Sequence, residues 1–234
     1  MTRARDLHVL KVLTSNSQRG VLAALAPELE RTSGLKLSIS YDPAKVMLRR
    51  IAAGESADVA ILGQAAIDAL AEQGKIDGES RRTLARCGVG LAVRAGAPKP
   101  DIGSVEALKR ALLNAKSIIY TSEGASGMHF SGVIERLGIA PEIKAKAHRQ
   151  TGGLVAERVA SGEVELGVQQ IPELLAVRGV ELVGPLPQQM QSISIITAGI
   201  FKASKHREAA QALLDFLATP AAMRVFRTQG IEPV

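Results

Sequence analysis

Short β-rich runs alternate regularly with amphipathic helical stretches along this sequence. Residues 8–14 have the composition of a strand, and residues 18–32 place apolar side chains on one helical face before Gly34. Further strands are predicted at 35–41 and 58–62, each followed by a helix. Successive strand–helix units of this length predict a parallel sheet with helices on both faces.

A second α/β series follows an extended apolar run at 87–94 and a Gly/Pro-rich break at 96–100. Its predicted elements are helices at 104–113, 127–136 and 152–160, strands at 117–120, 165–169 and 180–183, and an extended stretch near 143–147. The chain then crosses back at 192–200 and ends in helices at about 206–217 and 219–228.

Two such series joined by two extended crossings predict an α/β fold of two lobes. Each lobe is expected to be a mostly parallel sheet flanked by helices, and the two crossings to form a two-stranded hinge. We expect residues 1–88 plus 196–234 to form lobe 1 and residues 89–195 to form lobe 2, with a ligand cleft between them.

The composition narrows the class of ligand. The chain has two tyrosines, four phenylalanines and no tryptophan, which disfavours sugar sites and single-stranded nucleic-acid platforms, since both depend on aromatic stacking. The net charge of +6 favours an anionic partner. The basic residues are dispersed in pairs such as Arg49-Arg50, with acids between them, so we expect no nucleic-acid partner.

Common catalytic and cofactor motifs are missing. The sequence has no Walker A run, no Gly-x-Gly-x-x-Gly before a helix, no His-Glu-x-x-His and no Cys-x-x-Cys, and its four histidines lack metal-ligand spacing. The single cysteine, Cys87, lies in an apolar run and is expected to be a small buried hydrophobe. We therefore expect no cofactor and no metal. No segment approaches the ~20 apolar residues that span a bilayer, so membrane insertion is not expected.

Polar, small-residue turns follow the predicted strands at the points where helices begin. They are Thr14-Ser15-Asn16-Ser17, Asp42-Pro43-Ala44-Lys45, Leu62-Gly63-Gln64, the run 121–127, Gln150-Thr151-Gly152-Gly153 and Gln169-Gln170. Ligands of open α/β sheets lie at the carboxyl ends of the strands, where helix N-termini offer N–H groups to an anion. Ser17, Asp42 and Ser126 also suit the role of helix N-caps.

The sequence resembles a known family. Leu-Lys-Val-Leu-Thr-Ser-Asn-Ser at 10–17, Arg-Ile-Ala-Ala-Gly-Glu-Ser-Ala-Asp-Val at 50–59, Glu-Arg-Leu-Gly-Ile at 135–139 and Gly-Glu-Val-Glu-Leu-Gly-Val at 162–168 resemble the molybdate-binding proteins of bacterial ABC transporters. The resemblance covers nearly the whole chain in the same order. It implies a type II periplasmic solute-binding fold, with two lobes and a donor-lined anion site.

The resemblance also implies site residues. Ser17 matches a serine that contacts the oxyanion, Gly63 and Ser126 match backbone donors, and Gly152 falls near another. Two positions depart from the family pattern: Lys45 replaces a serine and Gln170 a tyrosine. A full positive charge and a carboxamide favour an organic acid over a metal oxyanion. The expected ligand-binding residues are Asn16, Ser17, Lys45, Gly63, Ser126, Gly152, Gly153 and Gln170.

This branch is also similar to aconitate isomerase, an enzyme on the same scaffold. That likeness implies an alternative in which Arg19, Lys45 and Arg49 hold carboxylates and His129 moves a proton. A second alternative is a cytoplasmic anion sensor.

Our main expectation is a monomeric solute-binding protein that captures a small anion for the permease of an ABC importer. The resemblance implies a periplasmic location, and a native start at Met1 would instead imply a cytoplasmic one.

Overall fold

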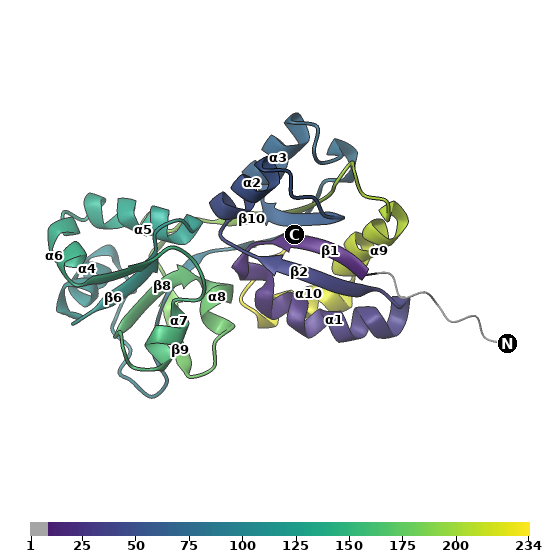
Figure 1. Cartoon of the computed structure of the whole chain (residues 1–234). Coiled ribbons are helices and arrows are strands. Elements are labelled where there is room, and N and C mark those ends of the chain that lie inside the picture. The colour runs from purple at the N-terminus through teal and green to yellow at the C-terminus, as the bar shows by residue number, and fades with distance from the viewer. Residues whose placement is uncertain (1–8) are drawn as a thin grey trace. The chain divides into compact units, whose positions relative to one another are not determined.

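The computed structural model describes residues 9–234, which divide into two compact units (Figure 1). Among the described residues, unit 1 comprises residues 9–86 and Ile195–Val234, and unit 2 comprises Cys87–Ser194. The chain passes between them twice, once in each direction. Each unit is a sheet flanked by helices, which confirms the predicted fold class. His8, the predicted start of the first strand, lies outside the described residues.

Unit 1 is built on a six-stranded sheet with the strand order β11-β4-β10-β3-β1-β2. Its elements are β1 (Val9–Thr14), α1 (Arg19–Ser33), β2 (Lys36–Tyr41), α2 (Ala44–Ala52), β3 (Val59–Gly63), α3 (Gln64–Glu72), β4 (Arg82–Cys87), β10 (Ser194–Ile200), α9 (Arg207–Leu217), α10 (Pro220–Thr228) and β11 (Glu232–Pro233). Strands β2, β1 and β3 run parallel, and β10 joins them antiparallel.

The helices of unit 1 cover both faces of this sheet. Figure 1 shows α2 and α3 on one face and α1 with α10 on the other. Met47 and Ile51 of α2 and Ile67 and Leu70 of α3 are fully buried in one cluster with Leu62 of β3. Apolar burial on each face is therefore what holds the three parallel strands in place, as the helical spacing of these residues predicts.

Unit 2 is built on a five-stranded sheet with the order β7-β6-β8-β5-β9. Its elements are β5 (Val89–Arg94), α4 (Val105–Asn114), β6 (Ile118–Thr121), α5 (Ala125–Arg136), α6 (Ala140–Ala145), β7 (Ala147–Gln150), α7 (Ala156–Ala160), β8 (Leu166–Gln170), α8 (Ile171–Leu175) and β9 (Val180–Pro185). Strands β7, β6 and β8 are parallel to one another. Strand β5 pairs antiparallel with β8, and β9 pairs antiparallel with β5.

Alternate residues of β6 supply the two cores of unit 2. Ile118 and Tyr120 pack into the cluster that contains α4, α5 and α6, whereas Ile119 packs with Val155 and Val159 on the opposite face. This is the period of two that a strand covered on both faces requires.

Three local predictions are wrong. Residues 140–145 form the helix α6, and of the extended stretch predicted near 143–147 only Ala147 lies in a strand, at the start of β7. Residues 152–155 precede α7 rather than belonging to it. Strand β4 and the short helix α8 have no counterpart in the prediction. Within residues 9–234, no helix has the length and apolarity needed to cross a membrane.

Candidate functional site

The three parallel strands of unit 1 end side by side. Thr14, the last residue of β1, is paired with Tyr41 at the end of β2 and with Ile61 of β3. The turns 15–18, 42–45 and 63–64 therefore leave the sheet at one edge, which we call the carboxyl edge of unit 1. Each turn leads directly into a helix, the arrangement in which open α/β sheets bind ligands.

The first of these turns holds three buried polar residues, Asn16, Ser17 and Gln18. The Ser17 hydroxyl lies 2.8 Å from that of Ser15 and accepts a hydrogen bond of 3.3 Å from the Gln18 amide. The prediction that Ser17 caps the helix is wrong, because Gln18 is the residue before α1 and its side chain makes no capping hydrogen bond. The turn is instead ordered by contacts among its own polar groups.

The second turn carries Lys45 in the first turn of α2, with its side chain exposed. The Asp42 N–H donates to the last carbonyl of β1 at 3.2 Å. The predicted cap at Asp42 is wrong: Pro43 is the residue before α2, and the Asp42 carboxylate pairs with Arg50. Arg50 also donates two hydrogen bonds of 2.6 Å to Glu55, and these hydrogen bonds, aided by its positive charge, lower the pKa of that carboxyl. These ion pairs hold the turn that presents Lys45.

Gly63 ends β3 and is the residue before α3. No atom lies within 4 Å of the place where a Cβ at this position would stand. There is therefore free space beside Gly63 on the side where a side chain would stand.

The three helices that begin at the carboxyl edge of unit 1 have no acidic residue in their first turns. The same holds for α5 and α10, whereas the first turns of α4, α6 and α9 contain Glu106, Glu142 and Glu208. Arg19 and Lys45 instead add positive charge at the N-termini of α1 and α2. Because a helix N-terminus is already partly positive, this edge concentrates positive potential.

Unit 2 has a corresponding edge. Thr121 at the end of β6 is paired with Gln150 at the end of β7, and Tyr120 with Val168 of β8. The turns 122–127, 151–153 and 170–171 leave the sheet together, and we call them the carboxyl edge of unit 2.

Ser126 lies in the first turn of α5 and is buried. It is not the predicted helix cap, since Gly124 occupies that position. Thr121 lies beneath the same turn: a Cβ on Gly127 would stand 1.7 Å from the Thr121 carbonyl oxygen. The Thr121 hydroxyl is buried and has no hydrogen-bond partner within the described residues. A buried hydroxyl without a partner is costly, and Thr121 is a polar residue that the sequence prediction missed.

The turn after β7 is fixed through its carbonyls. The Gln150 amide donates to the Gly152 carbonyl and the Gln169 amide to the Gly153 carbonyl, both at 2.9 Å. Gly153 has φ of 83°, a left-handed conformation that glycine adopts at little cost. With their carbonyls engaged, the two glycines have N–H groups to which no partner is bonded in residues 9–234.

Gln170 ends β8, and its side chain is held on both sides. Its Nε2 donates to the Ser194 hydroxyl at 2.8 Å, and the Cys87 thiol lies 3.6 Å from its Oε1. Its N–H donates to the carboxyl of Glu173 at 3.3 Å. Burial raises the pKa of Glu173 to about 8. Gln170 therefore belongs to a polar cluster with Cys87, Glu173 and Ser194, at the two points where the chain enters and leaves unit 2.

His129, the residue of the catalytic alternative, lies in α5 with its Nε2 2.7 Å from the Met190 carbonyl oxygen. A carbonyl only accepts, so this contact assigns the proton to Nε2. In the neutral ring Nδ1 is then the unprotonated nitrogen.

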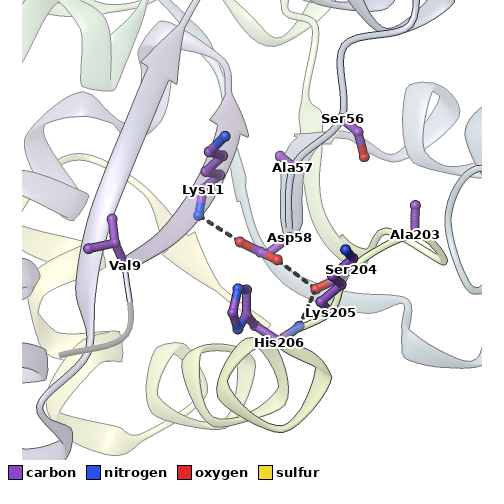
Figure 2. Close-up of a pocket in the computed structure, with 9 residues that line it drawn as sticks. All are labelled: Val9, Lys11, Ser56, Ala57, Asp58, Ala203, Ser204, Lys205 and His206. Atoms are coloured by element: carbon purple, nitrogen blue, oxygen red, sulfur yellow. Dashed lines mark hydrogen bonds between the residues drawn. The ribbon is translucent and has the colours of Figure 1, made fainter. Parts of the chain in front are cut away.

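A shallow pocket of about 230 Å³ lies at the opposite end of the unit 1 sheet, near the starts of β1 and β3 (Figure 2). The Asp58 carboxylate in it accepts from the Lys11 N–H at 2.9 Å and from the Ser204 hydroxyl at 2.6 Å. Ser204 in turn accepts from the His206 N–H at 3.1 Å. Asp58 thus ties β1 to the start of α9, and we assign it a structural role. No group of three or more potential metal ligands occurs in the described part of the chain.

Both carboxyl edges thus place hydrogen-bond donors in turns at the ends of parallel strands. A protein-family model described as bacterial extracellular solute-binding protein matches residues 10–232 of this chain. The chain belongs to this family. This solute-binding protein is also 36% identical over 237 residues to an aconitate isomerase of Pseudomonas sp, a match that covers 99% of this chain and 90% of the relative.

Two solved structures show the same fold. The periplasmic molybdate-binding protein of Azotobacter vinelandii superimposes with a TM-score of 0.80 at 20% identity, covering 95% of this chain and 98% of that one. The sulfate-binding protein SubI of Mycobacterium tuberculosis H37Rv superimposes with a TM-score of 0.76 at 18% identity, covering 97% and 87%. At these identities the likeness establishes the two-unit solute-binding fold.

The eight predicted ligand residues fall on these edges. Asn16, Ser17, Lys45 and Gly63 lie at the carboxyl edge of unit 1, and Ser126, Gly152, Gly153 and Gln170 at that of unit 2. Their role as ligand contacts stays a prediction.

Proposed function

We propose that this protein binds a small organic anion through the donors at its two carboxyl edges. The observation that carries the proposal is the charge pattern of unit 1, where three helices begin at one edge without an acid and two of them carry Arg19 and Lys45. Cations near a helix N-terminus cost roughly 0.3–1 kcal/mol each. A bound anion offsets that cost.

The donors of unit 2 support the same ligand class. The first turn of α5 is uncharged and lies over the unpartnered hydroxyl of Thr121, and the N–H groups of Gly152 and Gly153 are available beside it. Lys45 and Gln170 favour a carboxylate over a compact metal oxyanion, because the ammonium supplies a full positive charge and the carboxamide both donates and accepts hydrogen bonds.

We further propose that the protein is a periplasmic monomer that delivers its anion to the permease of an ABC importer. The family's extracellular character and the fold shared with the periplasmic molybdate-binding protein of Azotobacter vinelandii support this.

Isothermal titration calorimetry with citrate, both aconitates, sulfate and molybdate tests the binding proposal. We expect a carboxylate to bind, and Ser17→Ala and Thr121→Val each to weaken it. Ser33→Ala, an exposed serine at the far end of α1, is the matched control and should leave the affinity unchanged. If Ser17→Ala and Thr121→Val both bind as tightly as the wild type, the donors are not those of the ligand site.

The second candidate is an isomerase that moves a double bond in a tricarboxylic acid, favoured by the 36% identity to an aconitate isomerase over 99% of this chain. In this reaction one carbon loses a proton and another gains one, so no oxidant is needed. Nδ1 of His129 is the base that the geometry offers.

Nuclear magnetic resonance of cis-aconitate incubated with the protein tests this candidate. His129→Gln keeps an N–H donor for the Met190 carbonyl but removes the base, so turnover should be lost while citrate binding persists. Absence of trans-aconitate with the wild-type protein excludes the candidate and leaves the binding proposal standing.

A further inference from the structure

We infer that Arg19 is a specificity-determining residue that holds a second carboxylate of the ligand, and that Tyr41 positions its guanidinium. The inference rests on the proposed function, since it assigns a part of the same anion site. It narrows the ligand class from organic anions in general to molecules with at least two carboxylates.

The Arg19 side chain is fixed at the carboxyl edge of unit 1 by two contacts. Its guanidinium carbon lies 4.2 Å from the centre of the Tyr41 ring, a cation–π distance. One of its nitrogens donates to the side-chain oxygen of Asn16 at 3.4 Å. Because Tyr41 ends β2 beside Thr14, both contacts lie at the point where β1 and β2 give way to their turns. The guanidinium is therefore oriented before any ligand arrives.

The charge of Arg19 is not neutralised by the protein. No carboxylate within residues 9–234 lies at ion-pair distance from it, whereas several other arginines of unit 1 are paired. Arg50 binds two carboxylates, and Arg31, on the same helix as Arg19, binds Glu28. A guanidinium has five N–H donors, and the Asn16 contact uses one. The remaining donors can form the planar, two-point contact that a carboxylate matches.

The position of Arg19 has no advantage for α1 itself. It is the first residue of that helix, where a positive charge is unfavourable, and its side chain is exposed. A positive charge that is placed where it destabilises its own helix, without stabilising that helix in another way, indicates a functional role.

Tyr41 provides the surface on which Arg19 rests. Its partial burial raises the pKa of the phenol, and the positive charge of Arg19 acts in the opposite direction with a smaller effect. The ring is thus neutral at physiological pH. A neutral ring face attracts the guanidinium while leaving its edge donors exposed. The hydroxyl has no part in this contact, so phenylalanine should replace tyrosine here.

These contacts discriminate between ligands. One carboxylate can take the N–H and hydroxyl donors of the turn that contains Ser17, and a second can bind Arg19. Sulfate, molybdate and monocarboxylates have no second carboxylate, so hydrogen bonds from the Arg19 guanidinium add little to their affinity. We therefore assign di- and tricarboxylates as the ligand class.

Titration calorimetry of Arg19→Met with citrate, tricarballylate and molybdate tests the inference. We expect the affinity for citrate and tricarballylate to fall by about 10- to 100-fold, the effect of losing hydrogen bonds to a charged group. Arg31→Met removes the same charge from the same helix at its other end and is expected to change nothing. Equal ligand-free melting temperatures of the two variants exclude a folding defect.

Variants of Tyr41 separate positioning from direct contact. Tyr41→Phe should bind tricarballylate like the wild type, and Tyr41→Leu should bind it about threefold more weakly. If the wild type binds no anion in the panel, the proposed function fails. If the wild type binds tricarboxylates and Arg19→Met binds them equally well, the proposed function stands and the inference about Arg19 is overturned.

Discussion

Glu173 is a buried carboxyl whose oxygen accepts a hydrogen bond from the N–H of Gln170. It is buried in unit 2, and its pKa is raised to about 8 by that burial, with the N–H of Gln170 acting weakly in the opposite direction. A carboxyl of this kind is protonated at neutral pH in the folded protein but ionised in the unfolded chain, where its pKa is near the ordinary value of 4.5.

Glu173 should therefore make the free energy of unfolding depend on pH. Between the unfolded pKa and the folded pKa the folded state binds one more proton, so stability falls as pH rises from about 4.5 to about 8. Glu173→Gln keeps an oxygen for the Gln170 N–H but cannot ionise. In urea, the free energies of unfolding of the variant and the wild type should be similar at pH 5. At pH 8.5 that of the variant should be larger by about 2–4 kcal/mol. A constant difference across this range would mean that Glu173 does not titrate as described.

Cys87 should be unreactive in the folded protein. Burial, reinforced by the charge of Glu173, raises the pKa of the thiol to about 12, so very little thiolate forms at pH 8. Alkylation of the native protein with iodoacetamide at pH 8 is expected to be at least about 100-fold slower than in denaturing urea. Comparable rates in the two conditions would place the thiol at the surface, against the burial found here.

At the scale of a single element, α5 contains two glycines with opposite requirements. A Cβ on Gly127 would stand 1.7 Å from the Thr121 carbonyl oxygen, whereas nothing lies within 4 Å of a Cβ on Gly132. Gly127 permits the helix to begin directly over the end of β6. Gly132 has no such contact and lowers helix stability, because glycine loses more backbone entropy than alanine.

The two substitutions should consequently have opposite effects. Gly127→Ala should destabilise unit 2 by about 1–3 kcal/mol or more and weaken anion binding, because the first turn of α5 must shift. Gly132→Ala should stabilise by about 0.4–1 kcal/mol and leave binding unchanged. Thermal unfolding of both variants checks this, and a neutral Gly127→Ala would contradict the close approach of α5 to Thr121.

The elements show which parts of the fold could be predicted from sequence. Strands β1, β3 and β8 and helices α1, α4, α9 and α10 were predictable within two residues, because their apolar periodicity is set by burial on a sheet face. Helix α6 was missed because it has only six residues, too few for a helical period to be distinguished from an extended run.

The site could be predicted only at the level of its turns. Turns at strand ends follow from the strand–helix order, so the positions of Ser17, Gly63 and Gln170 are visible in the sequence. Contacts between turns are not visible there. The Arg19–Tyr41 pair depends on the register of β1 against β2, and the Arg50–Asp42 pair replaces a cap that Asp42-Pro43 suggests.

At the scale of the whole molecule, the chain consists of two units that each have a hydrophobic core and a carboxyl edge. Unfolding of such a protein can involve more than one transition, so ligand effects are best measured on each transition observed. Binding that involves donors from both units should stabilise both, whereas binding at one edge alone should stabilise only the unit that carries it.

Thermal melting in a panel of anions tests directly whether the protein binds a small polycarboxylate. Citrate, tricarballylate or the aconitates should raise the melting temperature, and sulfate and molybdate should raise it much less. At 100 times the Kd the stabilisation is about 2.7 kcal/mol, which corresponds to roughly 5–10 °C for a chain of this size. If the melting temperature rises with molybdate alone, or with none of the anions, the protein does not bind polycarboxylates in this way.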